Sequence, residues 1–334
     1  MTQRVFFLGA GFSRALHPKF PLMKELTKEV TARLEKDSVK KHLEEIAAPI
    51  TKDFETLLTY LGTDWPWKSD TTRHANLALY SAIIQNLSDI FRELALKYIY
   101  VNDYLVHETF YKFALQVVKQ KKQNNFITLN YDVLLEHLLW MASNWEMNYN
   151  DFYKYPMSLL DTRTLDSSSI ALRTPHPEAP AILKLHGSAN WFWTGVTASD
   201  DIYFSDNRDR QYENSVMGLK PYIIPPVLDK NAFYAHRAIQ ALWKKAEELL
   251  KQADEIYIIG FSFPQTDLSV RYLFQSALRN SEPDIYVVNR AKEDELRSIY
   301  QDVLQGQCVD YEYTGKENAV EVFLREVILS EAHQ

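Results

Sequence analysis

The chain has a single cysteine, Cys308, among its 334 residues. One thiol cannot close a disulfide within the chain, and it cannot supply the ligands of a cysteine-rich zinc site. The nine histidines show no spacing of the H-E-x-x-H kind that would bind a metal. The sequence therefore predicts no metal centre, and its cysteine content fits a reducing compartment.

Long apolar runs and excess positive charge are also missing. No uncharged apolar run approaches the roughly 20 residues that span a bilayer. The first apolar run, at residues 5–8, is far shorter than the core of a signal peptide. We therefore expect a cytoplasmic protein that does not enter a membrane. The formal net charge of −7 disfavours a general nucleic-acid binder, so no direct nucleic-acid partner is expected.

The stretch R-V-F-F-L-G-A-G-F-S-R at residues 4–14 is the most informative in the chain. Its four apolar residues are typical of a strand that is buried on both faces. Glycines directly after such a strand let the backbone turn tightly and approach a ligand. If a helix follows, its free N–H groups face the turn and can hold a diphosphate. The full fingerprint G-x-G-x-x-G would need a glycine where this chain has Arg14, so this turn by itself only favours nucleotide binding.

The next hundred or so residues have helical character. Apolar residues recur at every fourth position from Leu22 to Leu34, which predicts an amphipathic helix over 22–34. Further helices are predicted over 53–61, 71–100 and 103–122. One crossover between two strands does not need so many helices. We therefore expect one α/β domain over 1–334 that carries a helical insertion over 19–122.

Strands and helices alternate in the remainder of the chain. Strands are predicted at 125–130, 181–186, 222–225, 255–260 and 284–289, and helices at 133–143, 235–253, 268–280, 291–304 and 318–329. The polar segments 144–180 and 187–220 are expected to be loops, with a hairpin around Trp191 and Tyr203. This alternation predicts a Rossmann-like, doubly wound parallel sheet of the α/β class. Such sheets bind ligands at the carboxyl ends of their strands.

Small or polar residues follow five of the predicted strands. They are Gly9, Ala10, Gly11 and Ser13 after the first strand, then Asn130 and Asp132, then His186 and Gly187, then Gly260 and Ser262, and finally Asn289. Each has a plain structural explanation when it is taken alone, because Asn130 or Asp132 can cap a helix and Asn289 can end a strand. Together they favour a nucleotide site at one edge of the sheet.

The order of these residues resembles the sirtuin-like family of NAD-consuming enzymes. That family has, in sequence order, a G-A-G-x-S turn, a T-x-N-x-D segment, an H-G pair, a G-x-S segment and a strand-end asparagine. This chain matches them with Gly9, Ala10, Gly11 and Ser13; Thr128, Asn130 and Asp132; His186 and Gly187; Gly260 and Ser262; and Asn289.

Two departures from the classical sirtuin pattern limit what the resemblance implies. The classical deacylases carry a four-cysteine zinc module after the histidine, and one cysteine cannot build it. Their P-D-F-R segment is replaced here by P-K-F-P-L-M. The chain is more similar to zinc-free bacterial effectors of antiphage defence, which hydrolyse NAD and carry helical insertions. Phe54 and Glu55 match an F-E pair in those effectors.

The resemblance implies an NAD glycohydrolase, a hydrolase that releases nicotinamide and ADP-ribose from NAD and depletes NAD in antiphage defence. NAD is then a substrate, and no cofactor is expected. Asn130 is expected to orient a water or the ribose, and His186 to accept a proton with a pKa near ~6.5. Asp132 is expected to hold the amide of nicotinamide.

The remaining site residues are expected to bind the rest of the dinucleotide. Gly9, Ala10, Gly11 and Ser13 would hold the diphosphate through backbone N–H groups, with Gly260 and Ser262 assisting, and Asn289 would bind the adenosine ribose. The alternative is a regulatory subunit that binds NAD or ADP-ribose without cleaving it. A homo-oligomer is expected, and an ATPase or Argonaute-like protein is the kind of partner that the resemblance implies.

Overall fold

The computed structural model describes residues 2–34, 54–99, 107–120, 124–144, 146–154, 159–161, 176, 178–193, 202–204, 219–227, 230–265 and 267–330. The strands of the main sheet are β1 (Arg4–Leu8), β2 (Asn124–Thr128), β4 (Ala181–Lys184), β8 (Glu255–Ile259), β9 (Asp284–Val288) and β10 (Val309–Asp310). They lie in the order β10-β9-β8-β1-β2-β4, and every neighbouring pair is parallel. The predicted Rossmann-like parallel sheet is confirmed.

Strand β1 lies inside this sheet because all five of its residues are buried. Successive side chains of a strand point to opposite faces. On one face Phe6 stacks between Phe126 of β2 and Tyr257 of β8, with ring centroids 5.1 and 4.9 Å away. On the other face Phe7 contacts Phe274 at 5.0 Å. The run at 5–8 is therefore apolar throughout because helices cover both faces of the sheet.

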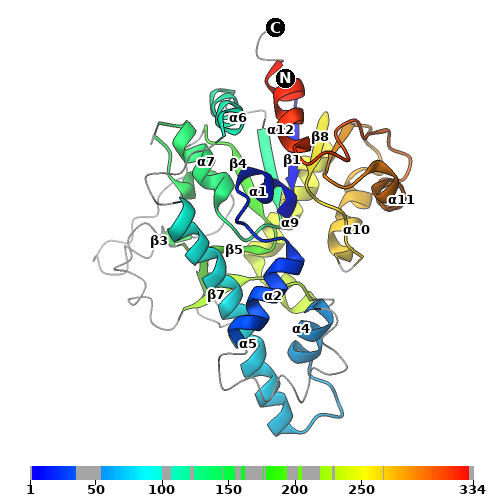
Figure 1. Cartoon of the computed structure of the whole chain (residues 1–334). Coiled ribbons are helices and arrows are strands. Elements are labelled where there is room, and N and C mark those ends of the chain that lie inside the picture. The colour runs from blue at the N-terminus through cyan, green and yellow to red at the C-terminus, as the bar shows by residue number, and fades with distance from the viewer. Residues whose placement is uncertain are drawn as a thin grey trace.

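Helices cover the sheet on both sides (Figure 1). One layer holds α1 (Ala10–Leu16), α6 (Glu108–Lys119), α7 (Leu134–Ala142), α12 (Ala319–Phe323) and the π-helical turn η5 (Leu324–Ile328). The other layer holds α9 (Arg237–Gln252), α10 (Leu268–Ala277) and α11 (Glu293–Val303), preceded by the short helix α8 (Asn231–Tyr234). The predicted final helix over 318–329 is thus an α-helix that continues as a π-helix.

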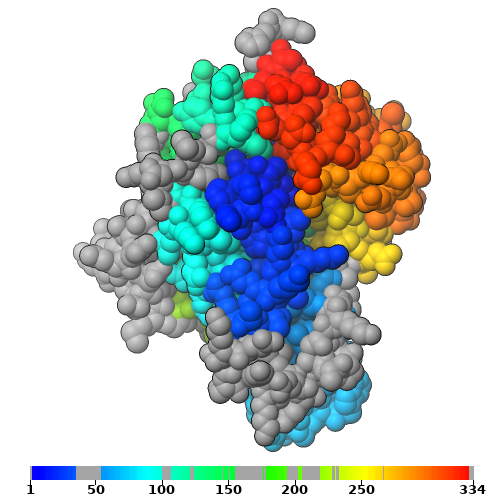
Figure 2. Space-filling view, viewed as in Figure 1, coloured from blue at the N-terminus to red at the C-terminus, as the bar shows by residue number. Residues whose placement is uncertain are grey.

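Helices also fill the described part of the predicted insertion. They are α2 (Met23–Leu34), α4 (Phe54–Gly62), α5 (Asp70–Leu94), η1 (Ala95–Ile99) and α6. Helix α5 packs on α2 and α4, and these three extend away from the sheet in the lower half of Figure 1. In the space-filling view, the blue segment that contains α1 and α2 lies at the surface of this face (Figure 2). The parts of the predicted helices at 35–53, 100–106 and 121–122 lie outside the described residues, and the insertion boundaries 19–122 stay a prediction.

A second sheet replaces much of what was expected to be loop. Its strands are β3 (Leu159–Asp161), β5 (Gly187–Trp193), β6 (Ile202–Phe204) and β7 (Lys220–Ile223). They lie in the order β3-β6-β5-β7. The 3-10 helical turn η2 (Tyr149–Phe152) comes before β3 in the chain. The predicted hairpin is confirmed, since Trp191 pairs with Phe204 and Phe192 with Tyr203. Strands of three or four residues are too short to show a period, so the sequence did not reveal β3. Helix α5 packs on β5 and β7.

None of the helices in the described ranges is long and apolar enough to cross a membrane.

Candidate active site at the carboxyl ends of the parallel strands

The five predicted strand-end segments lie in one row. Because the sheet is parallel, the residues after β9, β8, β1, β2 and β4 meet at the same edge, in the order Asn289, Gly260, Gly9, Asn130 and His186. Thr128 is in register with Lys184 in the adjacent strand. Asn130 and His186 each lie two residues further on, at matching positions of neighbouring strands. The structure therefore brings these sequence-distant segments to a common edge.

The glycine turn is interlocked with the end of β8. The Gly9 N–H donates to Ile259 O at 2.9 Å, and the Gly11 N–H donates to Gly260 O at 3.0 Å. A Cβ on Gly9 would lie 2.4 Å from Gly260 O. This differs from the expected phosphate cradle, because the backbone of the sheet edge already uses the N–H groups of these two glycines. Their role in the structure is the close approach of two backbones.

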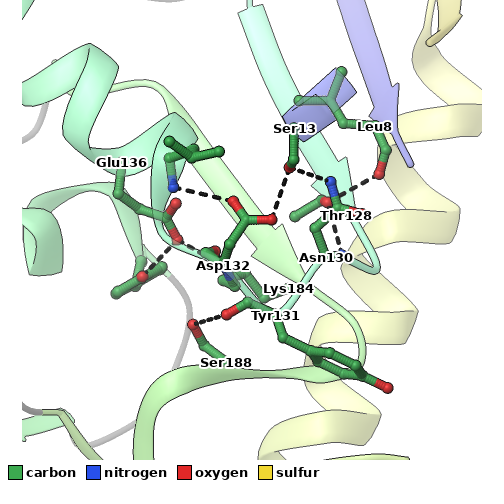
Figure 3. A network of polar contacts seen from close by, with 11 residues as sticks. Leu8, Ser13, Thr128, Asn130, Tyr131, Asp132, Glu136, Lys184 and Ser188 are labelled. Carbon is green, nitrogen blue, oxygen red and sulfur yellow. Dashed lines mark hydrogen bonds and ion pairs between the residues drawn. The ribbon is translucent and has the colours of Figure 1, made fainter. Parts of the chain in front are cut away.

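Three predicted site residues form one chain of hydrogen bonds (Figure 3). The amide Nδ2 of Asn130 donates to Gly9 O at 2.8 Å and to Ser13 Oγ at 2.9 Å. The hydroxyl of Ser13 in turn donates to Asp132 Oδ2 at 2.7 Å. Thr128 supports the chain, because its Oγ1 accepts from the Asn130 N–H at 3.0 Å and donates to Leu8 O at 2.9 Å. The orientation of the Asn130 side chain is therefore set from two sides.

Asp132 is buried with both carboxylate oxygens engaged. Oδ2 accepts from Ser13, and Oδ1 accepts from the Leu134 N–H at the start of α7 at 3.1 Å. The N-cap residue of α7 is Val133, so Asp132 bonds the turn before the helix and is not the helix cap that the sequence allowed. Burial raises the pKa of Asp132, while the nearby Lys184 ammonium and the hydrogen bonds from Ser13 and Leu134 lower it. Burial has the largest effect, so the pKa of Asp132 is raised above its ordinary value.

Behind Asp132 lies a buried charge cluster that sequence reasoning missed. Lys184 and Glu136 are each 1% exposed. The Lys184 ammonium donates to the main-chain oxygen of Asp132 and lies 3.0 Å from Glu136 Oε1. That same oxygen accepts a hydrogen bond from the hydroxyl of Tyr153 at 2.7 Å. The signal in the sequence was a lysine inside the otherwise apolar strand A-I-L-K-L-H, since a lysine inside a protein is almost always paired.

His186 is buried rather than open to solvent. Its side chain is 4% exposed, and its ring lies 6.3 Å from the ring of Trp243 on α9. Within the described part of the chain, its Nε2 has no hydrogen-bond partner. Burial, helped by the positive charge of Lys230 and opposed by Asp267, lowers the pKa of His186 to about 3. The expected pKa near ~6.5 is therefore not what the structure has, because the imidazole is out of water.

This burial has a consequence for stability at mildly acidic pH. Between the unfolded pKa of 6.5 and the folded pKa of about 3, the unfolded chain binds a proton at His186 that the folded chain does not. Stability therefore falls as the pH falls through this range. We expect the wild type to lose about 2 kcal/mol of unfolding free energy between pH 7 and pH 5 relative to His186→Gln.

Urea unfolding at several pH values measures this difference. The exposed histidine His74 on α5 provides the matched control, His74→Gln. Equal pH dependence in the wild type and in His186→Gln would show that the imidazole is not held neutral by burial.

Hydrogen bonds from three segments of the chain hold Asn289, which follows the last residue of β9. Asn289 Nδ2 donates to Phe261 O at 2.9 Å, and Asn289 Oδ1 accepts from the Ala291 N–H at 3.0 Å. The Gly315 N–H donates to Asn289 O at 3.1 Å. A cavity of about 470 Å³ opens beside this loop and is lined by Lys292, Glu293, Asp294, Arg297, Thr314 and Gly315. Ser262 lies exposed just past the end of β8.

No group of three or more histidine, cysteine, aspartate or glutamate side chains that could hold a metal ion occurs among the residues that the structure describes.

A comparison with models of known protein families identifies one family. A family model described as a SIR2-like domain matches residues 124–311, which is more than half of the chain. None of the curated proteins matches the sequence significantly.

Solved structures were compared with the whole chain. A sirtuin studied for substrate affinity is 12% identical, with 98% of this chain and 93% of that chain covered and a TM-score of 0.47. A Sir2 enzyme studied for mechanism and regulation is 12% identical, with coverages of 100% and 94% and a TM-score of 0.45. A Sir2 protein with a peptide and NAD⁺ is 12% identical, with coverages of 99% and 94% and a TM-score of 0.42. The strand order, rather than these distant likenesses, establishes the fold described above.

Proposed function

Because this chain belongs to the family of SIR2-like domains, a family of NAD-dependent enzymes, we propose that it is an NAD glycohydrolase. In this proposal it cleaves the bond between nicotinamide and ribose and releases nicotinamide and ADP-ribose. The hydrogen-bonded chain from Asn130 through Ser13 to Asp132 carries the proposal, since it lies at the sheet edge where His186 also ends its strand. NAD is the substrate, and no further cofactor is needed.

Cleavage of the bond between nicotinamide and ribose does not require an acid catalyst for the leaving group. Nicotinamide leaves NAD as a neutral molecule from a cationic ring, so the leaving group needs no proton. Positive charge develops on the ribose, as in the oxocarbenium-like transition states of glycoside hydrolysis. The protein must hold the ribose, place a water on its open face and take up one proton.

Asn130 is placed to orient that water or a ribose hydroxyl. Its Nδ2 is engaged by Gly9 O and Ser13 Oγ, so the amide plane is fixed before substrate binds. Among the described residues no hydrogen bond is made to its Oδ1, and an amide oxygen can accept two. The proposed role of Asn130 is to accept a hydrogen bond from the attacking water.

His186 would take up the proton as a neutral imidazole. With its pKa lowered to about 3, the ring is uncharged at neutral pH, which is the form that can accept. It is a weak base in this state. A water that has added to an oxocarbenium carbon is strongly acidic, however, so a weak base suffices for this step. The unpartnered Nε2 is the atom that the proposal assigns to the proton.

The other predicted site residues would bind the dinucleotide along the sheet edge. In the proposal Asp132 contacts the nicotinamide amide, and the glycine turn with Gly260 and Ser262 lets the diphosphate approach the backbone. The adenosine end would reach Asn289 and the neighbouring cavity of about 470 Å³. Depletion of NAD in antiphage defence, a homo-oligomeric state and an ATPase or Argonaute-like partner belong to the same proposal, and they are supported by resemblance alone.

Incubating the purified protein with NAD tests the proposal directly. We expect nicotinamide and ADP-ribose to appear in equal amounts, as measured by chromatography. The burial of His186 favours the alternative of a regulatory subunit that binds NAD or ADP-ribose without cleavage. Calorimetric binding of NAD without release of nicotinamide would support that alternative, and absence of both binding and cleavage would contradict both.

A further inference from the structure

The buried lysine of β4 requires an explanation beyond stability. Lys184 and Glu136 form an ion pair in which each side chain is 1% exposed. Removing two charges from water costs as much as their attraction returns, so an apolar pair of similar volume would stabilise the fold equally well. The buried pair therefore points to a task that an apolar pair could not perform.

The position of the lysine indicates that task. Lys184 is the last residue of β4, two positions before His186, and its ammonium donates to the main-chain oxygen of Asp132. The same ammonium lies 3.0 Å from Glu136 Oε1, an oxygen that also accepts a hydrogen bond from the hydroxyl of Tyr153. The positive charge of Lys184 also acts on the nearby buried carboxylate of Asp132. Figure 3 shows Glu136 and Lys184 near Asp132, at one end of the hydrogen-bonded chain that reaches Asn130.

We propose that Lys184 is a positioning residue of the site. Its ammonium balances the charge of the Asp132 carboxylate and anchors the backbone turn from Asn130 to Asp132. The inference rests on the proposed function, because it concerns how Asn130 is presented to NAD.

The direction of the hydrogen bonds explains how Lys184 reaches Asn130. An ionised carboxylate only accepts hydrogen bonds, so the Ser13 hydroxyl must donate to Asp132. The lone pairs of that hydroxyl are then free to accept from Asn130 Nδ2. If Asp132 were protonated, it could donate to Ser13 instead, and the hydroxyl of Ser13 would lose its fixed direction. Lys184 thus sets the orientation of the Asn130 amide through two intermediate groups.

The groups that face Asp132 come from three elements. They are Ser13 from α1, Glu136 from α7 and Lys184 from β4. Of these, Lys184 alone favours the ionised carboxylate by its charge, because Glu136 opposes it. Removal of Lys184 by itself would leave two buried carboxylates and endanger folding, so the test removes one charge of each sign.

The experiment compares Glu136→Gln with Glu136→Gln/Lys184→Met, two variants that differ only at residue 184. Steady-state NAD cleavage is measured from pH 5 to pH 9. We expect the double variant to lose at least about tenfold in kcat at pH 7 relative to Glu136→Gln. We also expect the acidic limb of its kcat profile to move up by about one pH unit or more, because Asp132 then needs a higher pH to ionise. Equal profiles, or a uniform loss at every pH, would overturn the inference.

A second measurement separates this inference from the proposed function. If the wild type does not cleave NAD, the proposed function fails, and urea unfolding of the same two variants still tests Lys184. A carboxyl with a raised folded pKa supports the fold at low pH, and this support is lost as the pH rises through that pKa. The double variant should therefore lose more stability than Glu136→Gln between pH 4 and pH 8. Parallel stability curves would overturn the inference.

Discussion

Asn130→Ala is expected to lower the kcat for NAD cleavage by about 100- to 1,000-fold, the range seen when one fixed polar group is removed from a reacting centre. The substitution deletes the oxygen that the proposal assigns to the attacking water. It also removes the donor to Gly9 O and Ser13 Oγ. KM should change far less than kcat, because in the proposal Asn130 stabilises the transition state rather than the bound NAD of the ground state. Initial rates of nicotinamide release measure both parameters.

A matched control exists on α5. The side chain of Asn86 is also half-buried and donates to a backbone oxygen, Ala82 O, at 2.9 Å. Asn86→Ala makes the same chemical change away from the strand ends, and its turnover should equal that of the wild type.

His186→Ala should also abolish turnover. The double variant with Asn130→Ala should be little worse than His186→Ala alone, since both residues act on one water. Unchanged kcat in Asn130→Ala would refute the assignment of that role.

Gly260→Ala should destabilise the protein by at least about 3 kcal/mol and remove NAD binding with it. Gly260 has a φ of +65°, a conformation that disfavours any residue with a Cβ. That Cβ would also lie 2.4 Å from the backbone nitrogen of Phe12 and 2.6 Å from Gly11. These neighbours are backbone atoms of the glycine turn, so the two strand ends would have to separate. Thermal unfolding and calorimetric NAD titration measure the two effects.

Gly306→Ala separates the conformational cost from the clash. Gly306 also has a positive φ, +78°, but no atom lies within 4 Å of its added Cβ. We expect Gly306→Ala to cost about 1 kcal/mol and to leave NAD binding unchanged. If the two variants were equally stable, the close approach of Gly260 to the turn would not matter for the fold.

The main sheet could be predicted from local patterns. Short apolar strands such as 5–8 and 255–259, separated by amphipathic helices, define a parallel order because a crossover helix leaves few alternatives. The strand-end residues followed from the same rule, and the structure places Asn130, Ser13 and Asp132 in direct contact. The second sheet was missed because β3, of three residues, carries no readable period.

The chemical state of the site residues could not be predicted in this way. His186 looked like an ordinary imidazole at a strand end, yet Trp243, which lies 57 positions further on, packs against it and removes it from water. The glycine turn looked like a free phosphate cradle, yet β8 uses the N–H groups of Gly9 and Gly11. Lys184 was a charge inside an apolar strand, and only the structure shows that its ammonium pairs with Glu136 and donates to the main-chain oxygen of Asp132.

The sequence by itself determined the strands of the main sheet, their parallel direction and the edge at which the polar residues gather. These depend on hydrophobic periodicity and chain connectivity, which are local properties of the chain. Only the tertiary structure decided which hydrogen-bond donors have partners, which side chains are buried from solvent and which charges form ion pairs. Burial and hydrogen bonding depend on atoms from segments far apart in the sequence, and they set the pKa of a group and the direction of its hydrogen bonds.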